Sequence, residues 1–179
     1  MLACSIKQEA KRLKVKYRTD DPYEICDAMD IMVMLRSMGR SPNACKGFYL
    51  VNNRCKLVVI NSDLPEWIRR IIHVHELGHA VLHSDSSISA YHDFNMLDNT
   101  DRMEYEANLF AAEFLLDDDE VMDALKEGQG LYQVAQHLYV PPELLDFKLR
   151  VLQREGVEIA APYFAHGDFL KRDLGQLSS

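Results

Sequence analysis

The sequence predicts an α+β fold, in which helices and a short antiparallel sheet form a core domain and a helical subdomain follows. Two observations lead to this prediction. Residues rich in β-formers come in two short runs, at 47–51 and 56–60, between segments with helical periodicity. After residue 116 all further periodic segments are helical. With 179 residues, the chain can build one full core and a small addition. We predict a core domain at 1–116, a helical subdomain at 117–159 and a tail at 160–179.

In the N-terminal half, the sequence predicts a helical or frayed arm, a helix and a hairpin, in that order. A run of basic residues indicates a helical or frayed arm with a solvated face; it comprises Lys7, Lys11, Arg12, Lys14, Lys16 and Arg18. Residues 21–38 predict one helix, because apolar residues recur at helical spacing and Gly39 is a stop signal. The two β-rich runs predict an antiparallel hairpin. Its outer strand is a candidate for holding an extended peptide by backbone pairing.

The next helix is expected to begin near Asp63, which forms an N-terminal capping signal with Glu66. From there a set of residues follows the i, i+3, i+4, i+7 rule of one helix face. It comprises Ile68, Ile71, Ile72, His75, His79 and Leu82. Two histidines therefore lie on the stripe predicted to face the core.

The run His75-Glu76-Leu77-Gly78-His79 carries the chemistry of the sequence. Residues four apart on a helix lie one turn above each other, so both imidazoles can bind one metal ion. Glu76 lies beside that ion, where it can take a proton from an attacking water and pass it to a leaving amine. The alternative is a pair of hydrogen-bonded core histidines that bind no metal.

A hydrolytic zinc site needs a third protein ligand. His83 lies about 12 Å of helical rise from His75, too far for one ion, so it is expected to pack near the site or support a ligand. A histidine six residues after His79 would indicate the metzincin class, but Asp85 stands there.

A second helix at 101–116 supplies the better candidate. Glu104 shares a face with Ala107, Ala111 and other residues, and the small side chains allow this helix to approach the helix of His75 and His79 closely. We therefore expect Glu104 to be the third ligand. Glu106 projects from the opposite side and is expected to be solvated. Asn108, one turn beyond Glu104, is placed to hold a ligand by a hydrogen bond.

These motifs resemble the ImmA/IrrE metallopeptidases, small zincin-like proteins of bacterial mobile elements and stress regulation. The resemblance rests on HELGHAVLH at 75–83, on E-x-x-A-N-x-F-A-A-E-x-L-L at 104–116 and on INSDL at 60–64, before the helix that carries the two histidines. It extends from about residue 21 to 156, and it implies a zincin-like domain. It implies Zn²⁺ bound by His75, His79 and Glu104, with Glu76 as the catalytic acid/base. Members often carry a proline shortly after the paired leucines, whereas here acidic residues 117–120 follow.

The resemblance also implies a substrate. Several members are similar to anti-repressors, which cleave a helix-turn-helix repressor and so derepress a prophage, an integrative element or a stress regulon. The alternative is a non-hydrolytic zinc-binding regulator that acts through protein or DNA binding by its C-terminal helices. Glu76 favours the enzyme, because a purely structural site needs no carboxylate beside the metal.

Composition limits the partners and the compartment. The net charge of -8 argues against a nucleic-acid surface. No apolar stretch approaches the length of about 20 residues that a membrane span requires. The N-terminus is a poor signal peptide, and the four cysteines form no C-x-x-C pair. We therefore expect a cytoplasmic protein with reduced thiols.

Two further segments leave alternatives open. The polar stretch 84–100 contains Tyr91 and His92, either of which is a candidate to stabilise the oxyanion, although ordinary loop packing is favoured. Three helices are predicted at 117–127, 131–139 and 141–154. They loosely resemble a helix-turn-helix unit, but Glu143 and Asp146 would repel phosphate, so packing or partner docking is favoured.

Overall fold

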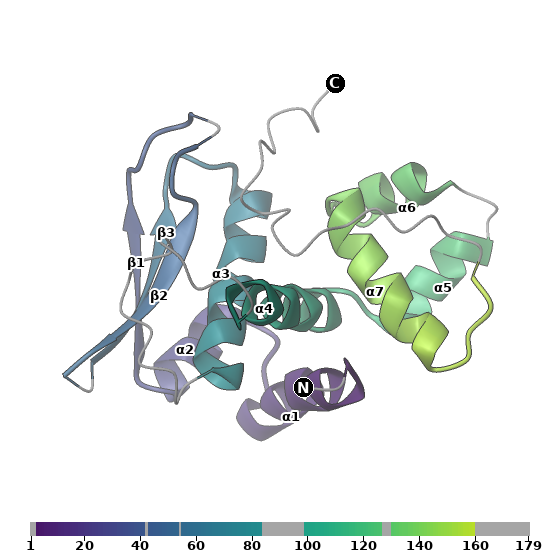
Figure 1. Ribbon diagram of the computed structural model, residues 1–179, viewed down its shortest axis with the longest axis horizontal. Helices are drawn as coiled ribbons and strands as arrows, with labels where there is room; N and C mark the ends of the chain where they lie inside the picture. The colour runs from purple at the N-terminus through teal and green to yellow at the C-terminus, as the bar shows by residue number, and fades with distance from the viewer. Residues whose placement is uncertain (1–2, 42, 54, 84–98, 127–129, 160–179) are drawn as a thin grey trace.

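The computed structural model describes residues 3–41, 43–53, 55–83, 99–126 and 130–159, and these form the predicted α+β fold (Figure 1). In this part of the chain the elements are α1 (Ala3–Tyr17), α2 (Pro22–Ala28), β1 (Ile31–Arg36), β2 (Gly47–Asn52), β3 (Cys55–Asn61), α3 (Glu66–Leu82), α4 (Asn99–Leu115), α5 (Asp118–Lys126), α6 (Leu131–His137) and α7 (Pro142–Arg154). None of these helices has the length and apolar character needed to cross a membrane.

The described sheet has three strands in the order β1-β3-β2. The predicted hairpin is confirmed, since β2 pairs antiparallel with β3. The prediction of a wholly antiparallel sheet is wrong, because β1 adds a parallel strand on the other side of β3. The prediction of one helix over 21–38 is wrong for the same reason. The helix ends at Ala28, Asp30 adopts a φ of 55°, and the next six residues pair with β3.

The start of α3 also differs from the prediction. Pro65 occupies the N-cap position, and the helix begins at Glu66 rather than near Asp63. The Asp63 carboxylate instead accepts hydrogen bonds of 2.7 Å from the Ser37 hydroxyl and from the Gly39 amide. It therefore fixes the loop after β1 rather than the helix end.

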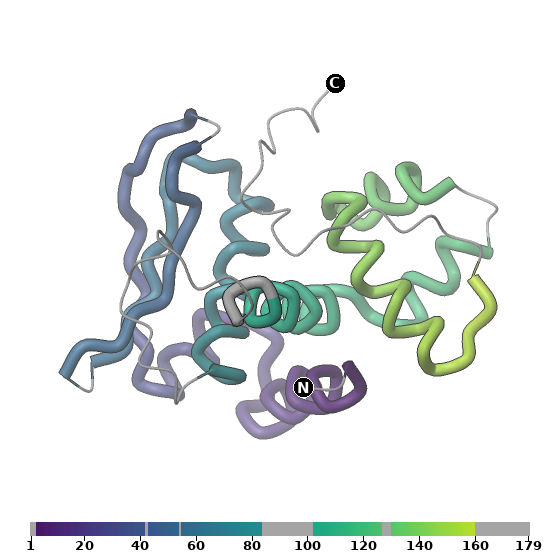
Figure 2. The backbone as a smooth tube through the Cα atoms, viewed as in Figure 1, coloured from purple at the N-terminus to yellow at the C-terminus, as the bar shows by residue number. Residues whose placement is uncertain are grey.

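The elements form layers that place α3 in the middle of the molecule. One face of the sheet lies against α3, and α4 crosses α3 on the side away from the strands (Figure 2). Helix α1 packs on α4. Residues from the sheet and from α1, α3, α4 and α7 contribute to one hydrophobic core. The middle of α3 is therefore shielded from solvent on all sides.

The N-terminal basic run forms the predicted helix, α1, and its solvated face is confirmed at Lys11, Arg12 and Lys16, which are exposed. The helix is not a free arm, because its apolar face is buried in the core through Ile6, Ala10 and Leu13. Lys7 is also buried and forms ion pairs with Asp118, at 2.9 Å, and with Glu155. The acidic start of α5 therefore neutralises part of the basic helix.

The three C-terminal helices occur close to the predicted bounds and enclose a second, smaller core. Helix α7 is shared between the two cores. Its Leu144 and Phe147 belong to the main core, whereas Leu145 and Leu149 belong to the second. The boundary after residue 116 stays a prediction, and the predicted tail at 160–179 lies outside the described residues.

Candidate metal centre

Helix α3 carries its histidines into the interior of the protein. His75 and His79 are 4% and 5% exposed. Gly78 between them allows α4 to approach, because a Cβ atom there would lie 3.0 Å from the Phe110 ring. The opposite side of α3 is buried as well, with His73 Nε2 3.3 Å from Cys26 Sγ. The close crossing of the two helices brings the carboxylate of α4 to the histidines.

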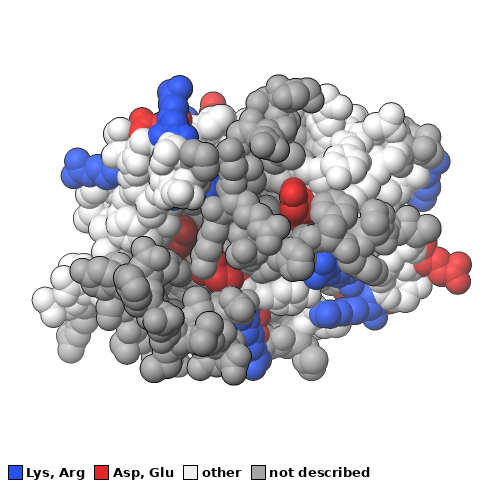
Figure 3. Space-filling model, turned by 45° about the horizontal axis from the view of Figure 1, so that its top comes forward, with Lys and Arg blue, Asp and Glu red and all other residues white. Residues whose placement is uncertain are grey.

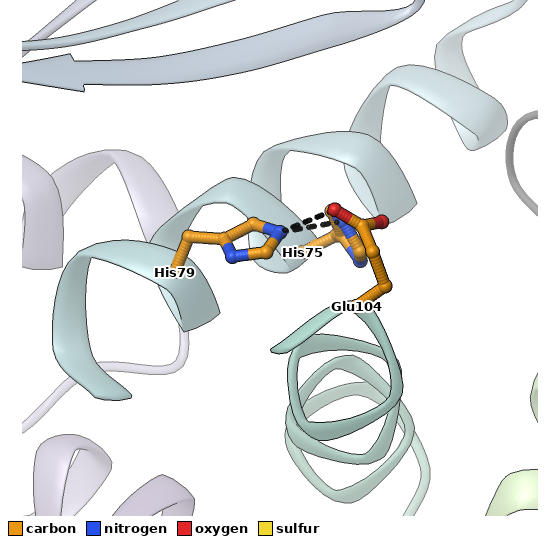
Figure 4. Close-up of side chains that lie close together, drawn as sticks. All are labelled: His75, His79 and Glu104. Atoms are coloured by element: carbon orange, nitrogen blue, oxygen red, sulfur yellow. Dashed lines mark hydrogen bonds and ion pairs between the residues drawn. The ribbon is translucent and has the colours of Figure 1, made fainter. Parts of the chain in front are cut away.

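His75, His79 and Glu104 converge on one point (Figure 4). The two Nε2 atoms are 3.1 Å apart. The Glu104 oxygens lie 3.5 Å from His75 Nε2 and 3.4 Å from His79 Nε2. Zinc bound to nitrogen and oxygen at about 2.1 Å in tetrahedral geometry separates its ligands by about 3.4 Å. The three side chains therefore match the spacing of three corners of a zinc coordination shell.

The electrostatics of this cluster favour a cation. Burial opposes ionisation of Glu104, but the two adjacent imidazoles outweigh it and hold the pKa of this carboxyl below its usual range. Glu104 is therefore an anion in the protein interior, next to two ring nitrogens that can bind a metal through their lone pairs. In the described residues this is the one group of three or more His, Cys, Asp or Glu side chains with converging ligand atoms. The donor set of two imidazoles and one carboxylate fits a divalent metal of the zinc type.

Glu76 lies next to the cluster and turns toward the sheet. Its carboxylate accepts a hydrogen bond from the backbone amide of Tyr49 on β2. Its Oε1 lies 3.5 Å from the position that a Cβ atom of Gly47 would occupy. Its Oε2 is buried and has no hydrogen-bond partner among the described residues. One oxygen is thus held by the strand, and the other is left to accept a proton.

The surroundings of Glu76 make it a stronger base than an ordinary carboxylate. Burial raises its pKa to about 7, and the negative charge of Glu104 acts in the same direction, whereas His79 and the Tyr49 amide oppose the shift. A carboxylate with this pKa can both take and return a proton near neutral pH. The sequence motif identified Glu76, but it did not identify Tyr49 or Gly47. The only available signal was a glycine at the start of a predicted strand, which often marks a close backbone approach.

His83 and Glu106 lie beside the metal ligands. The His83 ring packs beside His79, with centroids 5.5 Å apart, and its Nε2 lies 3.9 Å from a Glu106 oxygen. The prediction that Glu106 is solvated is wrong, since it is 6% exposed and accepts a 3.1 Å hydrogen bond from Arg102. Helix α4 is covered along most of its length, so its polar face is also enclosed.

Asn108 is fully buried one turn beyond Glu104. Its predicted hydrogen bond to a metal ligand stays a prediction. Tyr91 and His92, the candidates for oxyanion stabilisation, lie outside the described residues.

Comparison with known proteins agrees with this geometry. Over 143 residues the chain is 36% identical to "Uncharacterized immunity region protein 2" of Bacillus phage phi105, covering 80% of this chain and 88% of that protein. It is 29% identical over 147 residues to "Metallopeptidase ImmA" of Bacillus subtilis (strain 168), covering 80% of this chain and 83% of that protein. The family model of the IrrE N-terminal-like domain matches residues 26–150, which include both site helices. The chain therefore belongs to the IrrE N-terminal-like family of metallopeptidases.

Proposed function

We propose that this protein is a zinc-dependent endopeptidase that cleaves a helix-turn-helix repressor at one site and thereby relieves repression of a prophage, an integrative element or a stress regulon. The observation that carries the proposal is the convergence of His75, His79 and Glu104 beside Glu76. The similarity to an immunity region protein of a phage supports a substrate from the same kind of genetic element. We place this reaction in the cytoplasm, where such a repressor acts.

His75, His79 and Glu104 would hold the ion. When bound, zinc polarises the scissile carbonyl and increases the acidity of water. Glu76 then acts as the base: its free Oε2 takes the proton from the attacking water and passes it to the departing amine. The Tyr49 amide holds the other oxygen and so fixes the direction in which Oε2 points.

Strand β2 is suited to holding the substrate beside Glu76. The hydrogen bond from the Asn61 amide to the Lys46 carbonyl, together with the antiparallel register, fixes the alternation along β2. Phe48 and Leu50 exchange hydrogen bonds with β3, whereas Tyr49 directs its backbone groups to the other edge. No described strand pairs with this edge. The Tyr49 amide already donates to Glu76, so an extended peptide segment would add to this edge through the other backbone groups that point the same way, next to the base.

The alternative of a regulator that reads DNA through its C-terminal helices is disfavoured by burial. Helix α7 would be the recognition helix, yet it packs against both cores and Asp146 is fully buried. A helix enclosed on both sides cannot enter a major groove. On the part of the surface that Figure 3 colours, the basic side chains lie in small separate groups rather than in a continuous strip.

The experiment that tests the proposal mixes the purified protein, loaded with zinc, with the repressor encoded beside its gene. The native chain is expected to produce two fragments, and the Glu76→Gln variant none. Mass spectrometry of the fragments then identifies the scissile bond. Repressor that stays intact with the native chain, or that both variants cut equally well, would refute the endopeptidase assignment.

A further inference from the structure

The sheet face that points away from α3 carries a grid of apolar side chains. The strand register places Met32, Leu57 and Leu50 in one row across the three strands. Met34, Val59 and Phe48 form the next row. Because side chains alternate between the two faces of a sheet, all six point to the side opposite Val58 and Ile60, which lie in the main core.

This outer sheet face, defined by the two rows of three side chains, belongs to neither hydrophobic core. Met32 is 63% exposed, Met34, Phe48, Leu50 and Leu57 are half-buried, and Val59 on the central strand is buried between its neighbours at 5% exposure. The grid is bounded on one side by the loop that binds Asn61, through hydrogen bonds to Gly39 and Cys45, and on the other by the hairpin turn. A contiguous apolar patch framed by polar groups is typical of an interaction site.

We propose that the outer sheet face is a docking site for an amphipathic helix of the protein substrate, with an apolar stripe and carboxylates along its margin. This inference rests on the proposed endopeptidase function and adds the part of the enzyme that selects the substrate.

The shape of the face suits a helix. Neighbouring strands lie about 4.8 Å apart, so the two outer strands are separated by about 10 Å, close to the diameter of a single helix. The two methionines at the β1 margin have flexible, polarisable side chains that adapt to a helical surface. A repressor of the helix-turn-helix class consists largely of helices, so it can supply such a stripe.

Charge argues for acidic groups at the margin of the partner. On the three strands, the charged side chain at an outward position is Arg36, which is exposed and whose Nε lies 3.0 Å from Met34 Sδ. The outward positions of these strands carry no carboxylate, although the chain has a net charge of -8. An acidic-rimmed partner would thus be repelled by much of the protein but accepted here. A second copy of the chain would offer Arg36 no carboxylate from the same face.

The outer sheet face and the candidate metal centre share strand β2. Phe48 and Leu50 flank Tyr49, whose amide holds Glu76. A helix seated on Phe48 and Leu50 is therefore bound to the same strand whose free edge lies beside the base. Docking there would bring the neighbouring extended segment of the substrate to that edge.

Binding to an inactive enzyme tests the inference without cleavage. In the Glu76→Gln background, calorimetry measures the affinity of the zinc-loaded protein for the repressor encoded beside the gene. We expect Met32→Glu to weaken binding by about tenfold or more, and Arg36→Glu to weaken it by about threefold or more and to reduce its salt dependence. Val15→Glu, which changes an even more exposed apolar residue on α1 (78% against 63% for Met32), is expected to leave the affinity unchanged within about twofold.

Zinc content and the thermal unfolding midpoint show whether each variant is folded. Met32→Gln replaces Met32→Glu if the charge prevents folding, and it should weaken binding as well. If Met32→Glu binds as tightly as Val15→Glu while the native enzyme cuts the repressor, the docking site is wrong and the endopeptidase proposal stands. If the native chain neither binds nor cuts the repressor, both are wrong. If sedimentation shows a native dimer that Met32→Glu disrupts, the face belongs to a second copy.

Discussion

Glu104→Ala should remove one of three metal ligands while leaving the helices in place. In structural zinc sites, four ligands contribute about 10–16 kcal/mol, or about 2.5–4 kcal/mol each. The loss of one ligand therefore weakens zinc binding by about 100- to 1000-fold. The distances of 3.4 and 3.5 Å from Glu104 to the two histidines support a full ligand contribution.

Glu106→Ala is the matched control, because it removes an equally buried carboxylate from the same helix. Glu106 accepts a hydrogen bond from Arg102 and lies 3.9 Å from His83 Nε2, and it is outside the group of converging ligand atoms. We expect zinc affinity to fall by less than about tenfold, below the range of about 10- to 100-fold that is typical when a group that holds a metal ligand is removed. Competition with a chromophoric chelator at neutral pH measures both affinities, and circular dichroism confirms that both variants are folded. Equal losses would mean that Glu104 is not the third ligand.

Three further predictions follow from the packing and the buried charges. Gly47→Ala should destabilise the fold by about 1–3 kcal/mol and reduce kcat, because its Cβ would lie 2.5 Å from Ile72 Cγ2 and displace β2; an unchanged urea midpoint would contradict this. Lys148→Met should cost about 3–5 kcal/mol of stability, because it removes the ammonium group that lies 3.0 Å from the buried Glu113 carboxyl, and Glu113→Leu in the same chain should restore most of the loss in chemical denaturation. Burial opposes ionisation of Asp118, but two ammonium groups outweigh it and lower its pKa to about 2. Because this pKa is lowered, ionised Asp118 adds about 1–2 kcal/mol to the free energy of unfolding above about pH 4, and this contribution is lost as the pH falls toward 2. Asp118→Asn should remove this part of the pH dependence of stability.

The sequence predicted the site helices well because local signals there are strong. The histidines one turn apart and the carboxylate in phase with small residues needed only helical geometry to be placed. Glu106 shows the limit of this reasoning. Periodicity shows which face of its helix a side chain lies on. It does not show whether other elements of the fold bury that face.

The errors in the N-terminal half have one physical cause. Residues 31–35 are apolar at positions that suit both a helix and a strand, so their state is decided by pairing with β3, which is distant in sequence. Lys7 is similar, since its burial depends on carboxylates more than 100 residues away. The Tyr49 amide could not be predicted as a partner of Glu76, because backbone groups leave no trace in the pattern of side chains.

The most direct test of the metal centre is a crystal structure of the zinc-loaded protein with anomalous diffraction measured at the zinc edge. We expect one peak about 2.0–2.2 Å from His75 Nε2, His79 Nε2 and a Glu104 oxygen, with Glu76 Oε2 facing the open coordination position. A peak elsewhere, a fourth protein ligand that closes the site, or Glu76 turned away from the ion would contradict the account.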